Sequence, residues 1–172
     1  MRMNHRSGTR EAIGVNPMHV IAVGAVVIAA VVSFLLNTPA THAAGANAPI
    51  VSTTKTSLGR FLVNSSGRTL YLFGKDRNGK SACAGMCATF WPPLVATGKP
   101  RAAAGVKASM LGTSKRADGR LQVTYNHHPL YTFAKDKKKG QTNGEGLNAF
   151  GANWYVISPG GSKIVKPSGG GY

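Results

Sequence analysis

The sequence predicts an all-β fold in which two divergent, hairpin-based repeats pack as one small pseudo-symmetric sandwich or barrel-like domain. Glycine is frequent, at 22 of 172 residues, and it accompanies β-branched and aromatic residues, a composition that favours strands and turns. The pattern Tyr-x-Phe-x-x-Asp occurs at residues 71–76 and again at residues 131–136. Each copy follows a leucine and precedes a basic, glycine-containing loop and a later tryptophan, which indicates a duplicated unit.

Residues 1–43 have the features of an export signal. A basic start precedes an uncharged apolar run at residues 20–36, and small residues follow this run. We expect the run to be a helix, either in a signal peptide cleaved after Ala43 or in an uncleaved membrane anchor. Its length leaves both open, because a membrane span needs about 17–25 residues. Either way the rest of the chain is extracytoplasmic, secreted or anchored to the outer face of the cytoplasmic membrane.

The first repeat, residues 57–98, begins with a strand–turn–strand pattern. Residues 44–56 before it are mostly small and polar and are expected to form a linker. Strands are expected at residues 60–64 and 68–73, and Gly67 between them supplies the positive φ of a tight hairpin turn. The later Trp91 is expected to cover one end of the core.

The second repeat, residues 109–157, has the same pattern. Its strands are expected at residues 111–115, 121–125, 130–133 and 153–157. Asp118-Gly119 is a strong hairpin signal between the first two strands, and residues 126–129 form a further turn. The Pro-, Gly- and Ser-rich residues 159–172 are expected to be a flexible tail. Because a lone hairpin leaves an apolar face uncovered, the repeats are expected to pack on each other.

These motifs resemble the tandem secreted-repeat lipoproteins, bacterial envelope proteins of unknown function. The resemblance covers roughly residues 57–158 and is carried by both Tyr-x-Phe-x-x-Asp segments, Cys83-x3-Cys87, Phe90-Trp91-Pro92-Pro93-Leu94 and Trp154-Tyr155-Val156. It implies an envelope location and a repeat fold, and no biochemical activity. The chain departs from the family name because its only two cysteines lie in the first repeat, so no lipidated cysteine follows the signal.

The duplicated motif has two interpretations. In the structural one, each aspartate lies just past a strand and accepts backbone N–H bonds that fix the turn. In the functional one, the two copies surround a pseudo-two-fold pocket and contact a ligand. That candidate site consists of Tyr71, Phe73, Asp76, Tyr131, Phe133 and Asp136.

The cysteine segment also has two interpretations. In an exported chain, Cys83 and Cys87 are expected to form a disulfide. The alternative is a metal site for copper or haem, because Cys83, Met86 and Cys87 offer soft sulfur ligands and His127 and His128 are the only imidazoles after the signal. Turn histidines are usually only solvated, so we otherwise expect no cofactor.

Charge restricts the partners more than it restricts the fold. The chain carries +16, and residues 44–172 alone hold 18 Lys and Arg against four acids. Anionic envelope polymers or lipid headgroups are the expected partners, together with the membrane through residues 20–36 if the signal stays uncleaved. Basic segments such as Lys115-Arg116 are expected to be solvated. No nucleic-acid recognition motif is present, so nucleic acid is not expected as a partner.

Enzyme motifs are missing from the sequence. It has no Gly-x-Ser-x-Gly, no phosphate-binding loop and no His-Glu-x-x-His, and the four acids of residues 44–172 leave few ways to build a carboxylate pair. We therefore expect a non-enzymatic binding or structural module of the cell envelope. The alternative is a metal-handling or redox protein that uses the cluster of Cys83, Met86 and Cys87.

Overall fold

The structure, a computed structural model, describes residues 48–165, and the predicted signal or anchor at residues 1–43 lies outside them. The described chain is mostly strand. Its elements are β1 (Ile50–Thr56), β2 (Gly59–Asn64), β3 (Tyr71–Phe73), α2 (Met86–Phe90), β4 (Arg101–Ala102), η1 (Ala108–Met110), β5 (Leu111–Lys115), β6 (Leu121–Tyr125), β7 (His128–Pro129), β8 (Asn148–Ala149) and β9 (Ala152–Val156). The all-β prediction is confirmed.

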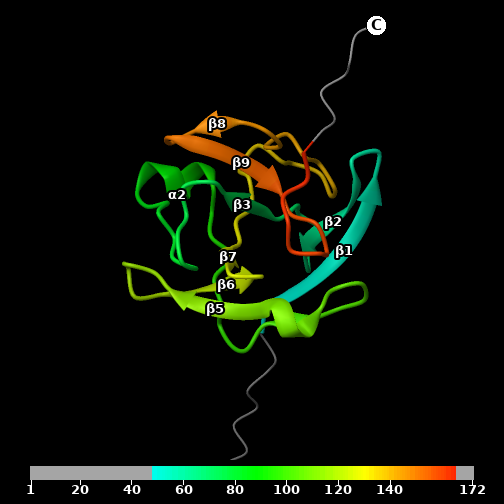
Figure 1. Ribbon diagram of the computed structural model, residues 1–172, viewed down its shortest axis with the longest axis horizontal. Helices are drawn as coiled ribbons and strands as arrows, with labels where there is room; N and C mark the ends of the chain where they lie inside the picture. The colour runs from blue at the N-terminus through cyan, green and yellow to red at the C-terminus, as the bar shows by residue number, and fades with distance from the viewer. Residues whose placement is uncertain (1–47, 166–172) are drawn as a thin grey trace, which may run out of the picture. The chain divides into compact units, whose positions relative to one another are not determined.

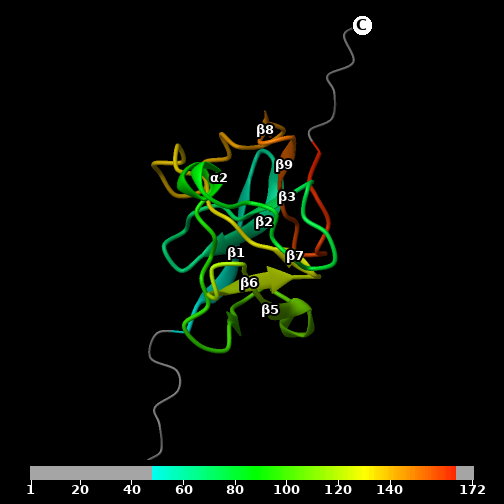
Figure 2. The same cartoon turned by 90° about the vertical axis from the view of Figure 1, so that its left-hand side faces the viewer.

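Three small sheets of three strands each make up this part of the chain, in the orders β2-β1-β4, β3-β9-β8 and β5-β6-β7. Only β4 pairs in parallel, with β1, and the other pairs are antiparallel. In both views β8 and β9 lie at one end and β5 and β6 at the other, with β3 between them (Figures 1 and 2). The short α-helix α2 lies beside the β8–β9 end (Figure 1).

Several local predictions are confirmed by the observed strands. β5 and β6 coincide with the two strands expected around Asp118-Gly119, where Gly119 has φ 83°. β9 lies within one residue of the expected closing strand. The turn after β2 is also present, because the amide of Gly67 donates to the carbonyl of Asn64 at 2.9 Å and Gly67 has φ 76°.

The linker prediction is wrong over part of residues 44–56. β1 begins at Ile50, and all of it except this first residue pairs with β2, from Val51 opposite Asn64 to Thr56 opposite Gly59. The physical reason is the β-branched content of the segment, which suits a half-buried pleated strand more than a linker. Val51 is fully buried.

The prediction of a strand at residues 130–133 is only partly correct. The regular strand here is β7, and beyond it Tyr131 forms only isolated bridges with Tyr71 and Pro93. Proline has no amide hydrogen, so a regular ladder cannot continue along that partner. The expected turn at residues 126–129 narrows to the two-residue loop Asn126-His127, where both φ angles are positive, as a type I′ hairpin requires.

The flexible-tail prediction is wrong for residues 159–165. The chain reverses at Gly161, which has φ 80°, and Ile157 then pairs with Lys163. The amide of Ile164 donates to the carbonyl of Val156 at 2.8 Å, and its side chain packs against the core. Tyr125 and Asn126 also donate to the carbonyls of Pro159 and Gly161, so this segment is tied to the second repeat. Residues 166–172 lie outside the described part.

The two repeats exchange strands across a pseudo-two-fold axis. β3 of the first repeat pairs with β9 of the second, with Tyr71 opposite Val156. In the corresponding place, Tyr131 of the second repeat pairs with Pro93 of the first. On the axis the two tyrosine backbones bond to each other, N to O at 2.9 Å and 3.1 Å. Each repeat therefore supplies a pairing partner for a strand of the other. The repeats are more closely interlocked than the simple packing of one on the other that was expected.

Two apolar clusters cover the two faces of the central strands. Successive side chains on a strand point to opposite faces, so Tyr71 and Phe73 enter an aromatic cluster while Leu72 enters an aliphatic one. β2 shows the same division, with Phe61 on the aromatic side and Leu62 on the aliphatic side. Burial on both faces places the duplicated motif at the centre of the core.

Candidate functional site

Four aromatic rings form a continuous stack inside the aromatic cluster. Phe73 stacks on Trp154 with ring centroids 4.0 Å apart. Trp154 stacks on Trp91 at 3.9 Å with the planes 2° apart, and Trp91 stacks on Phe133 at 4.2 Å. We call these four residues the ring stack. The two repeats alternate along it, so each tryptophan lies between the phenylalanine and the tryptophan of the other repeat.

The two motif tyrosines contact the ring stack edge-on, each at the tryptophan of its own repeat, and their hydroxyls bond to the other repeat. Tyr71 contacts Trp91 at a centroid distance of 5.3 Å, and Tyr131 contacts Trp154 at 5.1 Å. The Tyr71 hydroxyl donates to Asp136 Oδ2 at 2.7 Å, and the Tyr131 hydroxyl lies 2.9 Å from Asp76 Oδ2. Each tyrosine is therefore bonded to the aspartate of the other copy of the motif.

The aspartates also fix loops, as the structural interpretation of the motif expects. Asp76 Oδ1 accepts the amide of Ala82 at 2.8 Å, and Asp136 Oδ1 accepts the amide of Asn143 at 3.0 Å. Burial raises the pKa of Asp76 to about 6, although these hydrogen bonds oppose the shift. Burial likewise raises the pKa of Asp136. The six motif residues thus lie together in the core, where five of them are buried and Asp76 is partly exposed.

Burial and the neighbouring carboxylates keep the tyrosines in their neutral form. Desolvation is the largest cause of the raised pKa of Tyr71, followed by its hydrogen bond to Asp136. Desolvation also raises the pKa of Tyr131, and the charge of Asp76 adds to the shift. Both hydroxyls therefore stay protonated and can act as donors to the carboxylates across the physiological pH range.

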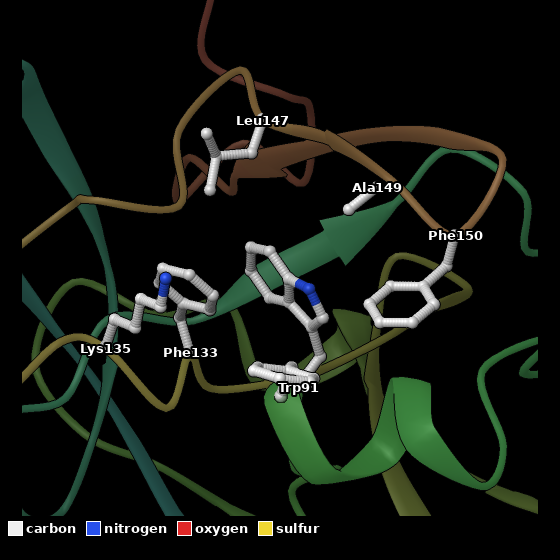
Figure 3. A pocket seen from close by; sticks show the side chains of 7 residues that line it. Trp91, Phe133, Lys135, Leu147, Ala149 and Phe150 are labelled. Atoms are coloured by element: carbon white, nitrogen blue, oxygen red, sulfur yellow. The ribbon is translucent and has the colours of Figure 1, made fainter.

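An open pocket lies beside the ring stack, where the second repeat's loops meet α2. It has a volume of about 240 Å³ and is lined by Phe90, Trp91, Phe133, Lys135, Leu147, Ala149 and Phe150. Figure 3 shows Leu147 and Ala149 on one side of Trp91, Phe150 on another, and Lys135 extending beside Phe133. We call this the aromatic pocket. Its inner wall, Trp91 and Phe133, is part of the ring stack.

The sequence matches, over residues 52–95 and 112–158, a family described as a secreted repeat of unknown function. The two ranges together make up more than half of the chain, and each contains one Tyr-x-Phe-x-x-Asp segment. The chain belongs to this family. The protein is extracytoplasmic, as its N-terminal segment predicted. No curated protein and no solved structure matches the chain.

In this secreted repeat protein the cysteine pair is oxidised. Cys83 and Cys87 form a disulfide, with their Cα atoms 5.3 Å apart, so the disulfide prediction is confirmed. In this state neither sulfur is a thiolate ligand, and Met86 points outward with 66% of its surface exposed. Residues 48–165 contain no group of three or more His, Cys, Asp or Glu that could hold a metal ion.

The two histidines lie on the β6–β7 hairpin of the second repeat. His127 is in its loop with φ 65°, and His128 pairs with Tyr125 in the sheet. Partial burial, with the neighbouring His127, lowers the pKa of His128. His127 is thus an exposed turn residue, as expected, whereas His128 lies in strand β7 and is partly buried. The described residues also contain no helix that is long and apolar enough to cross a membrane, and residues 20–36 lie outside them.

Arg116 differs most from its expected setting. The sequence placed it on a solvated basic face, but its side chain is only 5% exposed. Its Nη1 donates to Gln122 Oε1 at 2.6 Å and to Ser81 Oγ at 2.8 Å, and its Nη2 donates to the carbonyl of Cys83 at 2.7 Å. The guanidinium therefore ties the disulfide loop of the first repeat to the hairpin of the second.

Sequence reasoning missed the outer wall of the aromatic pocket. Phe90, Leu147 and Phe150 are each about 40% exposed, so nothing in a core pattern marks them. A signal was nevertheless available at Phe150, which lies before Gly151 in the two-residue loop between β8 and β9. Both residues have positive φ, 58° and 90°, and a bulky aromatic residue is rare in that conformation.

Proposed function

We propose that this protein is a non-enzymatic binding module of the bacterial cell envelope that holds a small ligand in the aromatic pocket. The observation that carries the proposal is a concave site that half-exposed apolar side chains form over two buried aromatic rings. Ligand pockets commonly have such walls with few polar groups. Scattered exposed apolar residues are ordinary, but Phe90 and Phe150 lie next to each other, with ring centroids 6.2 Å apart.

The strained conformation of Phe150 supports a role beyond folding. A type I′ loop favours asparagine at its first position, since αL is less unfavourable for asparagine than for other non-glycine residues. Phe150 holds this conformation with φ 58° and its ring lines the pocket (Figure 3). Residues held in such conformations cluster at ligand sites. Phe150 therefore strains the backbone of a turn that asparagine would form with less strain.

The use of the four acids after the signal supports a binding role over catalysis. Asp76 and Asp136 are bonded to tyrosines and loop amides, and Asp118 pairs with Arg116 and Arg120. Glu145 accepts the amide of Val156 at 2.6 Å. No acidic residue lines the aromatic pocket in the described part of the chain. General acid–base chemistry with a carboxylate therefore has no group at this site.

The charge of the chain supports attachment to anionic envelope polymers or lipid headgroups. The 18 Lys and Arg after residue 43 exceed the acids by 14, and such a field attracts polyanions at long range. Exposed charges are screened within about 8 Å at physiological ionic strength. Retention on isolated cell-wall material should therefore fall steeply as salt rises from 50 to 500 mM, whereas salt-independent retention would contradict an electrostatic attachment.

The pocket itself is tested by calorimetric titration with a set of two-ring aromatic probes, the naphthalene amide, carboxylate and amine. We expect binding of one or more probes to the full chain and its loss in Phe90→Ser, which opens the wall. Met86→Ser is the matched control, because Met86 is on the same helix but does not line the pocket. Absence of binding by every probe, or equal binding in both variants, would refute this site.

A further inference from the structure

The electrostatics of the aromatic pocket are set by one cation. Among the described residues that line it, Lys135 is the one charged residue. Lys135 makes no ion pair within residues 48–165, whose salt bridges both involve Asp118. The side chain is exposed at the pocket rim, beside Phe133 (Figure 3). A ligand that enters the pocket therefore meets an ammonium group with no protein counter-ion.

A second cation lies near the same pocket, on the Phe150 side. Lys75 Nζ is 3.5 Å from the carbonyl oxygen of Phe150. Lys75 and Lys135 occupy equivalent positions in the two copies of the motif, one residue before each aspartate. The aspartates themselves are turned inward to the tyrosines. The duplicated motif thus directs its carboxylates inward and leaves its lysines exposed near the pocket.

The size and walls of the pocket limit the body of the ligand. Its volume of about 240 Å³ lies below the range of roughly 300–1,000 Å³ that is typical of sites for drug-sized molecules. The walls are mostly aromatic, and Phe90 and Phe150 meet at 36° rather than face to face. Aromatic groups prefer offset or edge-on contacts with such rings. A small, flat, apolar body with one or two rings fits these walls.

From these observations we propose that the aromatic pocket binds a small planar aromatic acid, whose ring lies between the half-exposed rings of Phe90 and Phe150 and whose carboxylate pairs with Lys135. This inference rests on the proposed binding function and adds the chemical class of the ligand. The aromatic ring of the ligand would contact the pocket walls, and its carboxylate would favour it over neutral or cationic ligands of the same shape. A flat membrane surface fits less well, because it would contact only the rim residues and leave the hollow between them unfilled.

The test is calorimetric titration of the full chain with three isosteric probes: 2-naphthoate, 2-naphthamide and 2-naphthylmethylammonium. The expected order of affinity is anion, then neutral amide, then cation. Lys135→Gln should weaken 2-naphthoate by about fivefold, the upper end for a solvent-exposed charge pair, and leave the amide unchanged. Lys137→Gln is the matched control, because Lys137 is an exposed lysine that does not line the pocket.

Phe150→Asn separates the pocket from the stability of the fold. Asparagine is favoured at that loop position, so this variant should fold at least as well as the parent while it loses a pocket wall. We expect all probes that bind to weaken by tenfold or more in Phe150→Asn. Equal binding of 2-naphthoate to parent and variant would place the bound probe elsewhere and overturn the inference.

The outcomes distinguish the ligand class from the site. If the amide binds as tightly as the anion and both are lost in Phe150→Asn, the pocket stands and the acid is refuted. If no probe binds, the proposed site fails together with the inference. A third outcome is that no probe binds but the protein binds phosphatidylglycerol vesicles, and that Phe150→Asn weakens this vesicle binding. The aromatic pocket would then be a lipid-binding site, and the small-molecule inference would be refuted.

Discussion

Removal of one motif hydroxyl is expected to destabilise the opposite repeat. Tyr71→Phe deletes the donor that lies 2.7 Å from Asp136 Oδ2, and Asp136 is only 1% exposed, so water cannot readily replace the lost bond. A hydrogen bond to a charged group contributes about 1.5–3 kcal/mol, and a buried acceptor left unpaired adds to the loss. We expect the free energy of unfolding to fall by about 2–3 kcal/mol. Tyr131→Phe should cost about 1 kcal/mol, because its partner Asp76 is more exposed and Ser81 Oγ lies nearby.

A double-mutant cycle shows which aspartate is the partner. Urea unfolding, followed by far-UV circular dichroism, is measured for Tyr71→Phe combined with Asp136→Asn and, as the control, with Asp76→Asn. The crossed pair should show a coupling energy of about 1.5–3 kcal/mol, whereas the pair within one motif should be additive to about 0.5 kcal/mol. The opposite result, coupling of Tyr71 to Asp76 and additivity with Asp136, would refute the exchanged arrangement of the repeats.

Three further predictions concern the core and its charges. Gly144→Ala should destabilise the fold by about 1–3 kcal/mol in urea unfolding, because its Cβ would lie 2.6 Å from the ring of Trp91, which is fixed in the ring stack. The unfolding free energy should fall by up to about 3 kcal/mol as pH rises from 4 to 7, because the raised pKa of Asp76 makes the folded state bind the additional proton at low pH. Cys83→Ala, which opens the disulfide loop, should cost about 2 kcal/mol in thermal and urea unfolding.

Each of these has its own control. Gly98→Ala places its Cβ 3.6 Å from the nearest atom and should be nearly neutral, so equal loss in both glycine variants would count against the clash. Asp76→Asn should flatten the pH dependence between pH 4 and 7, and an unchanged slope would assign it to other groups. His128 acts in the opposite direction, because its lowered pKa removes stability as pH falls below about 6.5. Reductant should destabilise the parent chain and leave Cys83→Ala unaffected.

Local signals in the sequence were sufficient for much of the second repeat. Asp118-Gly119 and the alternation in residues 121–125 place β5 and β6 correctly, because turn chemistry and side-chain period act within a few residues. β1 was missed because its threonines are polar in composition yet β-branched in shape. The exchange of strands was not predictable, since the pattern of β3 shows that it is buried but not which strand pairs with it.

The candidate site was only half accessible to the same reasoning. The structure brings the six motif residues together, as the duplicated pattern predicted, and their contact with a ligand stays a prediction. Trp91, however, was expected at one end of the core and lies instead in the middle of the ring stack. The pocket depends on half-exposed residues from α2 and the β8–β9 loop. These residues are far apart in the sequence and become neighbours only in the folded chain, so their spacing does not predict the pocket.

The pairing of β3 with β9 also sets when this protein can fold. The partner of strand β3 is synthesised more than seventy residues after β3 itself. The hydrogen bonds between β3 and β9 therefore cannot form while the chain is still being synthesised. Pairings of such sequence separation form late and slowly. A polypeptide that must pass through a narrow translocation channel benefits from this delay, because it remains threadable until its last strand has crossed.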